Sequence, residues 1–223
     1  MKIGCVLVMY NPQRELLTAS LNALNEQVDE IFLGDNSVNM PDFITTLLNL
    51  YPNTYYHSFN KNLGIAEAQN RGIIYFQKKG FDFVLFMDQD SLAPNNLVSS
   101  LLADYNRLKE IGIPIGGIGP RPFNRGEGKP YVGAVKKGKL ILPKITEVGE
   151  IISSASLIPI SHFKQVGGME SSLFIDGVDH EWCWRAKKIG GWRFFISESV
   201  QLSHQVGEGD RPFIFRKVAI PTP

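Results

Sequence analysis

The stretch that decides the fold is residues 83–90, which read FVLFMDQD. The first five of these residues are all apolar, and an uninterrupted apolar run of this length indicates a strand that is buried on both faces. Two acids, Asp88 and Asp90, follow directly where that strand should end. In open α/β sheets, ligands bind beyond the carboxyl ends of the strands. The stretch therefore predicts an α/β fold whose ligand site includes these two acids.

The same unit, a short apolar strand and then a helix with one apolar face, occurs along the whole first half of the chain. Strands are predicted at residues 3–9, 30–34, 54–58 and 83–87, and apolar helical faces at 17–28, 43–50, 65–76 and 97–108. Asn11-Pro12 is predicted to cap and open the first helix, and Pro94 to open the fourth. This alternation predicts a Rossmann-like, mostly parallel central sheet flanked by helices.

The regular pattern stops at residues 120–150, which are rich in proline, glycine and basic residues. We expect a long excursion here, with a hairpin formed by residues 131–135 and 139–142. This excursion is either a solvated loop or a flap. A flap would face a site for an acceptor substrate or a membrane. Order is predicted to resume at 151–158, followed by a short helix near 163–166, a helix over 179–189 and a strand over 192–196.

Composition narrows the class of protein. The 223 residues are 43% hydrophobic and 20% charged, with a net charge of +1, which suits one globular domain and gives no reason to expect a nucleic-acid partner. The two cysteines, Cys5 and Cys183, are too few for a disulfide framework, so we expect a reduced, cytoplasmic setting. No apolar stretch approaches the eighteen or so residues of a membrane span. The expected location is cytoplasmic, with peripheral contact at the inner face of the cell membrane as a further expectation.

Three acidic positions are candidates for chemistry. Side chains two residues apart on an extended chain point to the same side, so Asp88 and Asp90 can face one site and hold a hard divalent cation together with a substrate phosphate. Asp35, followed by Asn36, ends the second strand, where it can accept a hydrogen bond from the N–H of a nucleotide base. At each place the alternative is turn chemistry, which Asp and Asn also favour.

Asp179 follows a short apolar run, 173–175, and precedes a helix. The positive end of the helix dipole favours a negative charge there, and a carboxylate at the mouth of a pocket can act as a general base. The alternative is that Asp179 only caps the helix, although capping and catalysis are compatible. His204 follows the last apolar run and is either a metal ligand or an ordinary hydrogen-bonded histidine.

Taken in order, these segments resemble the inverting glycosyltransferases with the GT-A fold (family 2 type), in particular their bacterial rhamnosyltransferase-like members. The matching segments cover residues 3 to about 209 and are 8–12 (VMYNP), 35–37 (DNS), 62–66 (NLGIA) with Asn70, 88–91 (DQDS), 167–169 (GGM), 179–185 (DHEWCWR) and 204–207 (HQVG). Each segment is weak by itself, and the ordered set is specific.

The resemblance implies one catalytic domain over 1–223, with a nucleotide-sugar half at about 1–115 and an acceptor half at about 116–223. It implies that Asp35 contacts the nucleotide base, with Tyr10, Asn11, Asn36 and the turn at Asn62 and Gly64 nearby. Asp88 would lie by the ribose and diphosphate, and Asp90 would be the main ligand of Mg or Mn. Asp179 would be the base that activates the acceptor, and His204 would complete the metal site.

The implied reaction is a single displacement that inverts the anomeric carbon. The expected donor is dTDP-rhamnose, with a UDP-hexose or UDP-galactofuranose as alternatives, and the expected acceptor is a lipid-linked glycan or a polysaccharide. Two features depart from the family pattern: Val178 stands where an acid often precedes the base, and similar proteins usually continue beyond the position at which this chain ends. The ending is expected of a shortened chain or of a minimal member.

Two other functions fit parts of the pattern. A nucleotidyltransferase also places acids on an α/β sheet, but it would carry a Gly- and Lys/Arg-rich triphosphate loop early in the chain, which residues 10–12 are not. A binding module on the same fold would bind the nucleotide sugar without turnover, because a fold alone does not determine function.

Overall fold

A computed structural model describes the backbone of residues 1–124, 129–130 and 137–204, and their side chains except at 124, 129, 130, 203 and 204. Ten strands within these residues form one sheet in the order β3-β2-β1-β4-β9-β5-β10-β8-β7, with β6 paired to β5. Their bounds are β1 Ile3–Met9, β2 Glu30–Asp35, β3 Thr54–Ser58, β4 Phe83–Asp88, β5 Ile115–Asn124, β6 Lys129–Pro130, β7 Lys139–Leu142, β8 Ile145–Val148, β9 Leu157–Pro159 and β10 Arg193–His204.

The four strands of the first half are parallel, as the strand–helix alternation predicts. The second half of the sheet is mixed: β9 lies antiparallel between β4 and β5, and β10 is parallel to β5 but antiparallel to β8. Because β9 pairs with β4, one continuous sheet joins the two halves of the chain. Residues 153–156, which precede β9, are thereby brought to the carboxyl end of β4.

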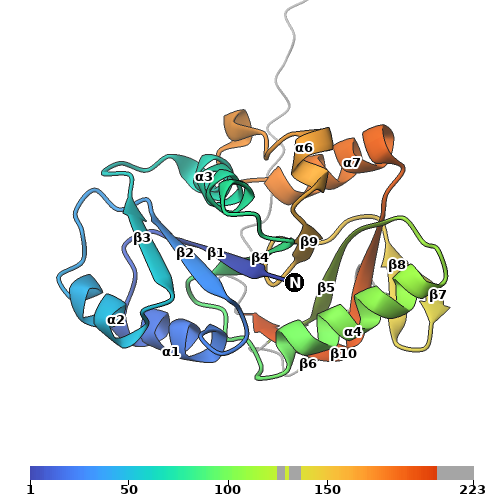
Figure 1. Cartoon of the computed structure of the whole chain (residues 1–223), viewed down its shortest axis with the longest axis horizontal. Helices are drawn as coiled ribbons and strands as arrows, with labels where there is room; N and C mark the ends of the chain where they lie inside the picture. The colour runs from blue at the N-terminus through green and yellow to red at the C-terminus, as the bar shows by residue number, and fades with distance from the viewer. Residues whose placement is uncertain (125–128, 131–136, 205–223) are drawn as a thin grey trace, which may run out of the picture.

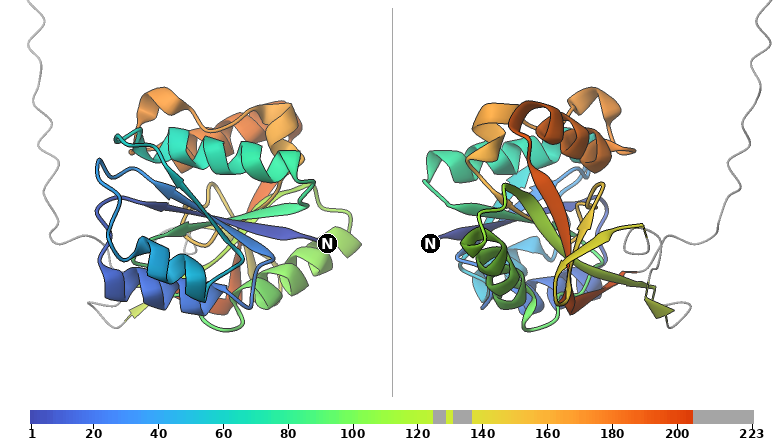
Figure 2. Two further views of the ribbon diagram at one scale, coloured as in Figure 1. Left: turned by 60° about the vertical axis from the view of Figure 1, so that its left-hand side comes forward. Right: turned by 90° about the vertical axis from the view of Figure 1, so that its right-hand side faces the viewer.

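Helices cover both faces of the sheet (Figure 1). They are α1 Arg14–Leu24, α2 Ile44–Leu50, α3 Gly64–Lys78, α4 Leu97–Glu110, α6 His162–Val166 and α7 Val178–Gly190, with a short 3-10 turn, η1, at Ser171–Leu173. α1, α2 and α4 lie on one face, and α3, α6 and α7 lie on the other (Figures 1 and 2). Each helix contributes an apolar stripe, as the three- and four-residue spacing of its apolar residues predicts.

Two cores result, one on each side of the sheet. Alternate residues of a strand point to opposite faces, so Cys5 and Leu7 of β1 pack with α1 and α4, while Val6 packs with α3. The core on the α3 side is centred on aromatic side chains, with Trp182 of α7 only 1% exposed. Cys5 and Cys183 are both buried and free, and burial raises the pKa of the Cys183 thiol to about 12.

Several local predictions are wrong in detail. Asn11 does not cap α1: its φ is +44°, and the N-cap is Gln13, which makes no side-chain capping bond. The 139–142 strand pairs with β8, residues 145–148, whereas 131–135 lies outside the described residues. In the segment 151–158, only its last two residues belong to a strand, β9. α7 begins at Val178, one residue before Asp179, because Gly177 in the left-handed conformation caps it.

No helix in the described part of the chain is long and apolar enough to span a bilayer.

Candidate active site

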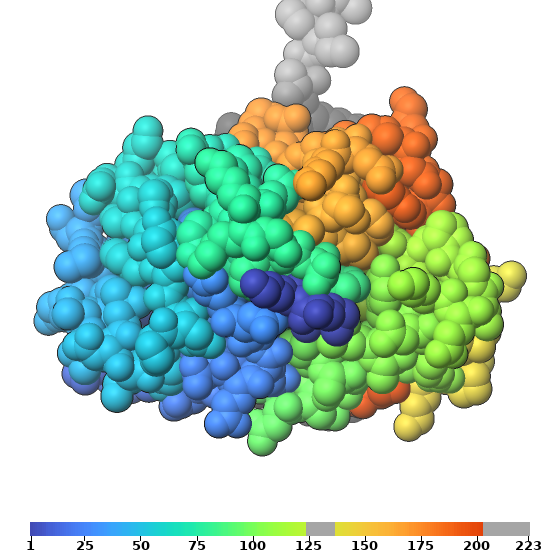
Figure 3. All heavy atoms as spheres, in the orientation of Figure 1, coloured from blue at the N-terminus to red at the C-terminus, as the bar shows by residue number. Residues whose placement is uncertain are grey.

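The site forms where β1, β2 and β4 end. In the parallel register Met9 lies beside Asp35, and Val8 lies beside Asp88, so the segments that follow these strands lie next to one another. Figure 3 views the face at which β1 begins, where the first residues (blue) are exposed below α3. The strands run away from this face, as the left view of Figure 2 shows, and the polar residues lie at the far edge.

Two adjoining cavities lie at this edge. The first cavity has a volume of about 250 Å³ and is lined by Val8, Met9, Tyr10, Asn36, Asn62, Gly64, Ile65, Asp88, Gln89, Asp90 and Ile175. The second cavity, of about 230 Å³, is lined by Ile65, Asp88, Ile152, Ser153, Ser154, Ile175, Val178 and Asp179. They share Ile65, Asp88 and Ile175. The structure therefore brings most of the predicted site residues to one continuous hollow.

Asp88 and Asp90 both line the first cavity, as predicted. β4 ends at Asp88, so Asp90 reaches the cavity from the turn that follows and not from a continued strand. The hydroxyl of Ser154 donates a hydrogen bond to Oδ2 of Asp88. Because Ser154 lies 66 residues further along the chain, this bond fixes the Asp88 carboxylate only once β9 has paired with β4.

Gln89 is the residue that ties the ends of β1 and β4 together. The N–H of Tyr10 donates to Oε1 of Gln89 at 2.8 Å, and Nε2 of Gln89 donates back to the Tyr10 carbonyl at 3.2 Å. This paired contact holds the Tyr10 backbone against the turn that carries Asp90. The side chain of Tyr10 itself is 48% exposed at the cavity.

Asn36 is buried and holds the turn that precedes α3. Its Oδ1 accepts from the N–H of Leu63 at 3.0 Å, and its Nδ2 donates to the Gly64 carbonyl at 3.1 Å. Asn62 completes the turn, because its Oδ1 accepts from the N–H of Gly64 at 2.9 Å. Asn36 thus contributes to the cavity wall and to its rigidity at once.

Gly64 is required at this turn on two grounds. Its φ is +79°, and a Cβ placed on it would lie 2.5 Å from the Phe174 carbonyl oxygen. We expect Gly64→Ala to destabilise the protein by about 3 kcal/mol or more. The steric clash of the new Cβ with Phe174 adds to the energetic cost of holding an alanine in the left-handed conformation. Gly80→Ala is the matched control: its φ is +71° with nothing within 4 Å, so it should cost only about 1 kcal/mol. Chemical denaturation measures the free energy of unfolding of both variants. Equal losses of stability would show that the contact with Phe174 does not add to the cost at Gly64.

Asp35 is fully buried, and it does not line either cavity. Its Oδ1 accepts from the N–H of Ser37 at 2.8 Å, and its Oδ2 accepts from the Tyr56 hydroxyl at 2.8 Å. The Ser37 hydroxyl in turn accepts from the N–H of Asn11 at 2.8 Å. In this arrangement Asp35 orders the segments after β1 and β2. A contact between Asp35 and a nucleotide base stays a prediction.

Removal of the Tyr56 hydroxyl tests that ordering role. Tyr56→Phe leaves a buried carboxylate oxygen without its partner, and we expect a loss of about 1–3 kcal/mol of unfolding free energy. Burial and the neighbouring Asp35 raise the pKa of Tyr56 to about 12, above the 10.0 of an ordinary tyrosine. The neutral hydroxyl is therefore favoured by folding, so its contribution is complete below about pH 10 and falls as the pH rises toward 12.

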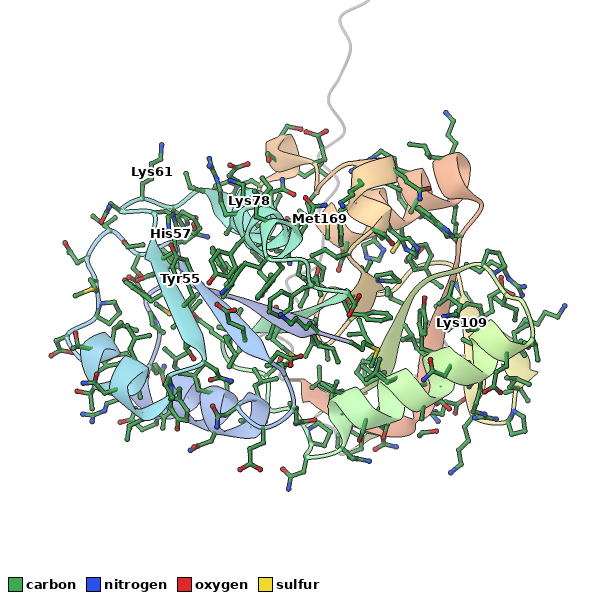
Figure 4. The ribbon with its side chains drawn as sticks, viewed as in Figure 1. Tyr55, His57, Lys61, Lys78, Lys109 and Met169 are labelled. Carbon is green, nitrogen blue, oxygen red and sulfur yellow. The ribbon has the colours of Figure 1, made fainter. Side chains whose placement is uncertain are left out.

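Tyr55→Phe is the matched control for that measurement. Tyr55 is 41% exposed and lies beside His57 on the edge strand β3 (Figure 4). Its loss of a hydroxyl should change the free energy of unfolding by less than about 0.5 kcal/mol, as is usual for surface positions. Equal effects of the two substitutions would contradict the role given to Tyr56.

Asp179 lies in the first turn of α7 and lines the second cavity, 23% exposed at its side chain. Its Oδ2 accepts from the N–H of Ser153 at 3.0 Å, and its Oδ1 accepts from the N–H of His180 at 2.9 Å. Two backbone donors thus fix the orientation of the carboxylate, and the helix N-terminus favours its negative charge. Asp179 therefore lies in the first turn of a helix and lines a cavity, as the sequence predicts, while its role as a general base stays a prediction.

The segment 167–177 joins α3 to α7 across the site. Asn70 of α3 accepts from the Met169 N–H at 2.6 Å and donates to the Met169 carbonyl at 2.8 Å. Arg185 of α7 donates to the carbonyls of Val166 and Gly168, both at 2.7 Å. These contacts link Asn70, the 167–169 turn and Arg185, and they position the loop that leads to Asp179.

His204 ends β10, where its backbone is in register with residue 124 of β5. Its side chain lies outside the described part of the structure, so its role as a metal ligand stays a prediction. Among the described side chains, no group of three or more His, Cys, Asp or Glu residues is arranged as a complete metal site.

The charge of the two cavities points to a cationic ligand. Asp88, Asp90 and Asp179 line them, and none of their described lining residues is Lys or Arg. A phosphorylated ligand could bind beside these carboxylates only with a cation between them. Two carboxylates that share one cavity suit a divalent ion that completes its coordination with waters and phosphate oxygens, so the residues present fit Mg²⁺ or Mn²⁺.

Reading the sequence alone missed Ser153, Ser154, Ile65, Ile152 and Ile175. The two serines bond to Asp179 and Asp88 across 26 and 66 residues, and no local pattern marks them. The sequence pattern places Ile65 on the apolar face of a helix and gives Ile152 and Ile175 no role at a site. Only the pairing of β9 with β4 and the course of segment 167–177 bring these five residues to the site.

Comparison with known proteins gives consistent results. A family model described as glycosyl transferase family 2 matches residues 5–157. The chain is also 30% identical over 214 residues to the dTDP-rhamnosyl transferase RfbF of Shigella flexneri, a match that covers 92% of this chain and 70% of that protein.

Solved structures resemble the chain in fold. GalNAc-T7, crystallised with UDP, GalNAc and Mn²⁺, aligns with a TM-score of 0.73 and 14% identity over 92% of this chain and 44% of that one. S. aureus TarS aligns with a TM-score of 0.62 and 15% identity over 92% of this chain and 37% of that one. The chain thus spans less than half of either structure, and at such identities the likeness shows the fold, which is of the GT-A type.

Proposed function

This chain belongs to glycosyl transferase family 2 and is a glycosyltransferase, and we propose that it moves rhamnose from dTDP-rhamnose to a lipid-linked or polysaccharide acceptor with inversion of the anomeric carbon. The observation that carries the proposal is the sharing of Asp88 between the two cavities. A donor whose diphosphate lies beside Asp88 and Asp90 places its sugar toward the second cavity. Asp179 lines the second cavity, in which the acceptor hydroxyl would bind.

The reaction is a single displacement. A lone pair of the acceptor oxygen forms the new bond to the anomeric carbon, the bond to the diphosphate oxygen breaks, and the electron pair leaves on the nucleoside diphosphate. Asp179 takes the proton of the acceptor hydroxyl as the bond forms. Its two backbone hydrogen bonds hold the carboxylate at one orientation, so little reorganisation is needed during the reaction.

A divalent cation is part of the proposal. Asp88 and Asp90 would hold it, with His204 as a further ligand, and when bound it would neutralise charge on the diphosphate as a Lewis acid. Ser154 keeps the Asp88 carboxylate in position through its hydroxyl. The acidic lining without described Lys or Arg residues supports a need for this cation.

Residues at the end of the first cavity would bind the nucleotide. Tyr10 and the turn at Asn62 and Gly64 line that cavity, and Asn11 and Asn36 fix its walls by hydrogen bonds. Asp35 would contact the base only after its bond to Tyr56 is exchanged for one to a base N–H; otherwise it acts by positioning residues 36–37. The acceptor would enter from the side of the second half of the chain, residues 116–223.

Calorimetry with nucleotides tests the proposal without knowledge of the acceptor. We expect dTDP to bind the wild-type protein more tightly than UDP or GDP, and its affinity to rise at least tenfold when Mn²⁺ or Mg²⁺ is added. Preference for UDP would indicate a UDP-hexose or UDP-galactofuranose donor. Failure of all three nucleotides to bind in the presence of metal would refute a nucleotide-sugar site.

Two further measurements separate the rival functions. A nucleotidyltransferase would consume a nucleoside triphosphate and release pyrophosphate, which the proposed enzyme does not. A binding module would bind dTDP-rhamnose but release no dTDP with any acceptor supplied. Release of dTDP coupled to transfer of rhamnose would support the proposal against both.

A further inference from the structure

Three isoleucines form part of the lining of the second cavity. Ile65, Ile152 and Ile175, which we call the isoleucine wall, line it together with the carboxylates of Asp88 and Asp179. Ile175 is 48% exposed, although it stands at a site where a polar ligand is expected. An isoleucine exposed inside a catalytic hollow gains free energy only when a bound apolar group covers it, at roughly 25 cal/mol per Å² of area buried.

The backbone holds Ile175 in this place at a conformational cost. Phe174 has φ +62° and ψ −68°, and the N–H of Ile175 donates to the Leu173 carbonyl at 2.7 Å, which together form a γ-turn. The Phe174 carbonyl accepts from the N–H groups of Ile65 and Ala66, at 2.7 and 3.2 Å. The Phe174 carbonyl therefore holds the backbone of residues 174–175 next to the start of α3, which includes Ile65. Such strained positions persist where the surroundings over-determine them and gather at functional sites.

Two hydrogen-bond donors of the second cavity already have protein partners. The Ser154 hydroxyl donates to Asp88, and the Ser153 N–H donates to Asp179. The wall itself presents only methyl and methylene groups. A sugar hydroxyl pressed against it would lose its water without gaining a partner, which weakens binding.

We propose that the isoleucine wall receives the C6 methyl group of a 6-deoxyhexose, and that Ile175 is the residue that selects 6-deoxyhexosyl donors over donors with a hydroxyl on C6. The inference rests on the proposed function, because it places the donor sugar in the second cavity. It goes further by assigning the choice of sugar to three named side chains.

The test compares two donors that differ only in the oxygen on C6: dTDP-L-rhamnose and dTDP-L-mannose. Their affinities are measured by calorimetry on the full chain with Mg²⁺, so no acceptor is needed. We expect the wild type to prefer dTDP-L-rhamnose by up to about 10²-fold, the limit for an apolar pocket that meets an added hydroxyl. Ile175→Ser should reduce this preference to about threefold or less, because its hydroxyl can pair with the C6 hydroxyl.

The ratio of the two affinities is the readout, since any loss common to both donors cancels. Ile152→Thr is the second variant and changes a wall residue from another segment of the chain. It should also reduce the preference for dTDP-L-rhamnose over dTDP-L-mannose. Ile189→Ser is the matched control, because Ile189 is 56% exposed at the end of α7 and lines neither cavity. It should leave the ratio unchanged, and thermal melting verifies that all three variants fold.

The outcomes distinguish this inference from the proposed function. Equal affinities of the wild type for the two donors, or an unchanged ratio in both wall variants, would overturn the assignment of the wall and leave the transferase site standing. If dTDP binds but neither sugar donor binds more tightly than dTDP, the donor class itself is wrong, and the inference falls with it.

Discussion

Replacing Asp179 with Asn should reduce the rate of sugar transfer by about 10²–10⁴-fold, the range that a general base contributes. The amide keeps the size of the side chain, and its one oxygen can still accept from the N–H of Ser153 or from that of His180, so the fold and the cavity should persist. It cannot take the acceptor proton. The affinity for dTDP should therefore stay within about twofold of the wild-type value, because the proposed nucleotide site is built on Asp88 and Asp90 and not on Asp179.

The measurement is dTDP release coupled to rhamnose transfer, together with calorimetric binding of dTDP. Asp42→Asn is the matched control, an exposed acid before α2 that should leave the transfer rate unchanged. Turnover of Asp179→Asn at the wild-type rate would remove Asp179 from the mechanism. A loss of rate accompanied by an equal loss of dTDP affinity would assign it to binding and not to proton transfer.

Replacing Asp90 with Ala should abolish the metal dependence of nucleotide binding. Asp90 is exposed in the turn after β4, so the substitution should not disturb the core. If Asp90 is the main ligand, the expected gain of at least tenfold in dTDP affinity on adding Mn²⁺ should disappear, a loss of at least about 1.4 kcal/mol. Binding measured without metal should change little.

Calorimetry of dTDP with and without Mn²⁺ gives this difference directly, and Asp42→Ala supplies the control for loss of one exposed acid. If Mn²⁺ raised the dTDP affinity of Asp90→Ala as much as that of the wild type, Asp88 and other residues would hold the cation without Asp90. Asp88→Asn would then show whether the carboxylate positioned by Ser154 is the main ligand.

The sequence by itself determined the framework. The strands predicted at 3–9, 30–34, 54–58 and 83–87 are all strands of the sheet, with bounds that agree to within one residue. Three of them could be predicted because a buried parallel strand is apolar at nearly every position. The fourth, the edge strand 54–58, is less apolar and was predicted from the strand–helix alternation. The placement of Asp88 and Asp90 at a cavity follows from the same signal, since both come within three residues of the end of an apolar run.

The tertiary structure alone decided what surrounds these acids. Gln27, Gln89 and Asn70 look like ordinary polar residues in the sequence, yet each bonds to a segment about 70 to 100 residues away. Asn11 looked like a helix cap, but the neighbouring Ser37 holds it in a left-handed turn instead. Contacts of this kind depend on how strands are ordered in the sheet, and sequence spacing does not encode that order.

The pairing of β9 with β4 is the largest effect of this sort. It brings Ser153 and Ser154 to Asp179 and Asp88, and it turns a stretch that reads as a strand into the wall of the second cavity. The strained turn at Phe174 likewise exposes Ile175, which any local pattern assigns to a core. The local sequence indicates which residues can take part in chemistry. Long-range strand pairing determines which residues surround them, because burial and hydrogen bonding act between segments that are distant in the chain.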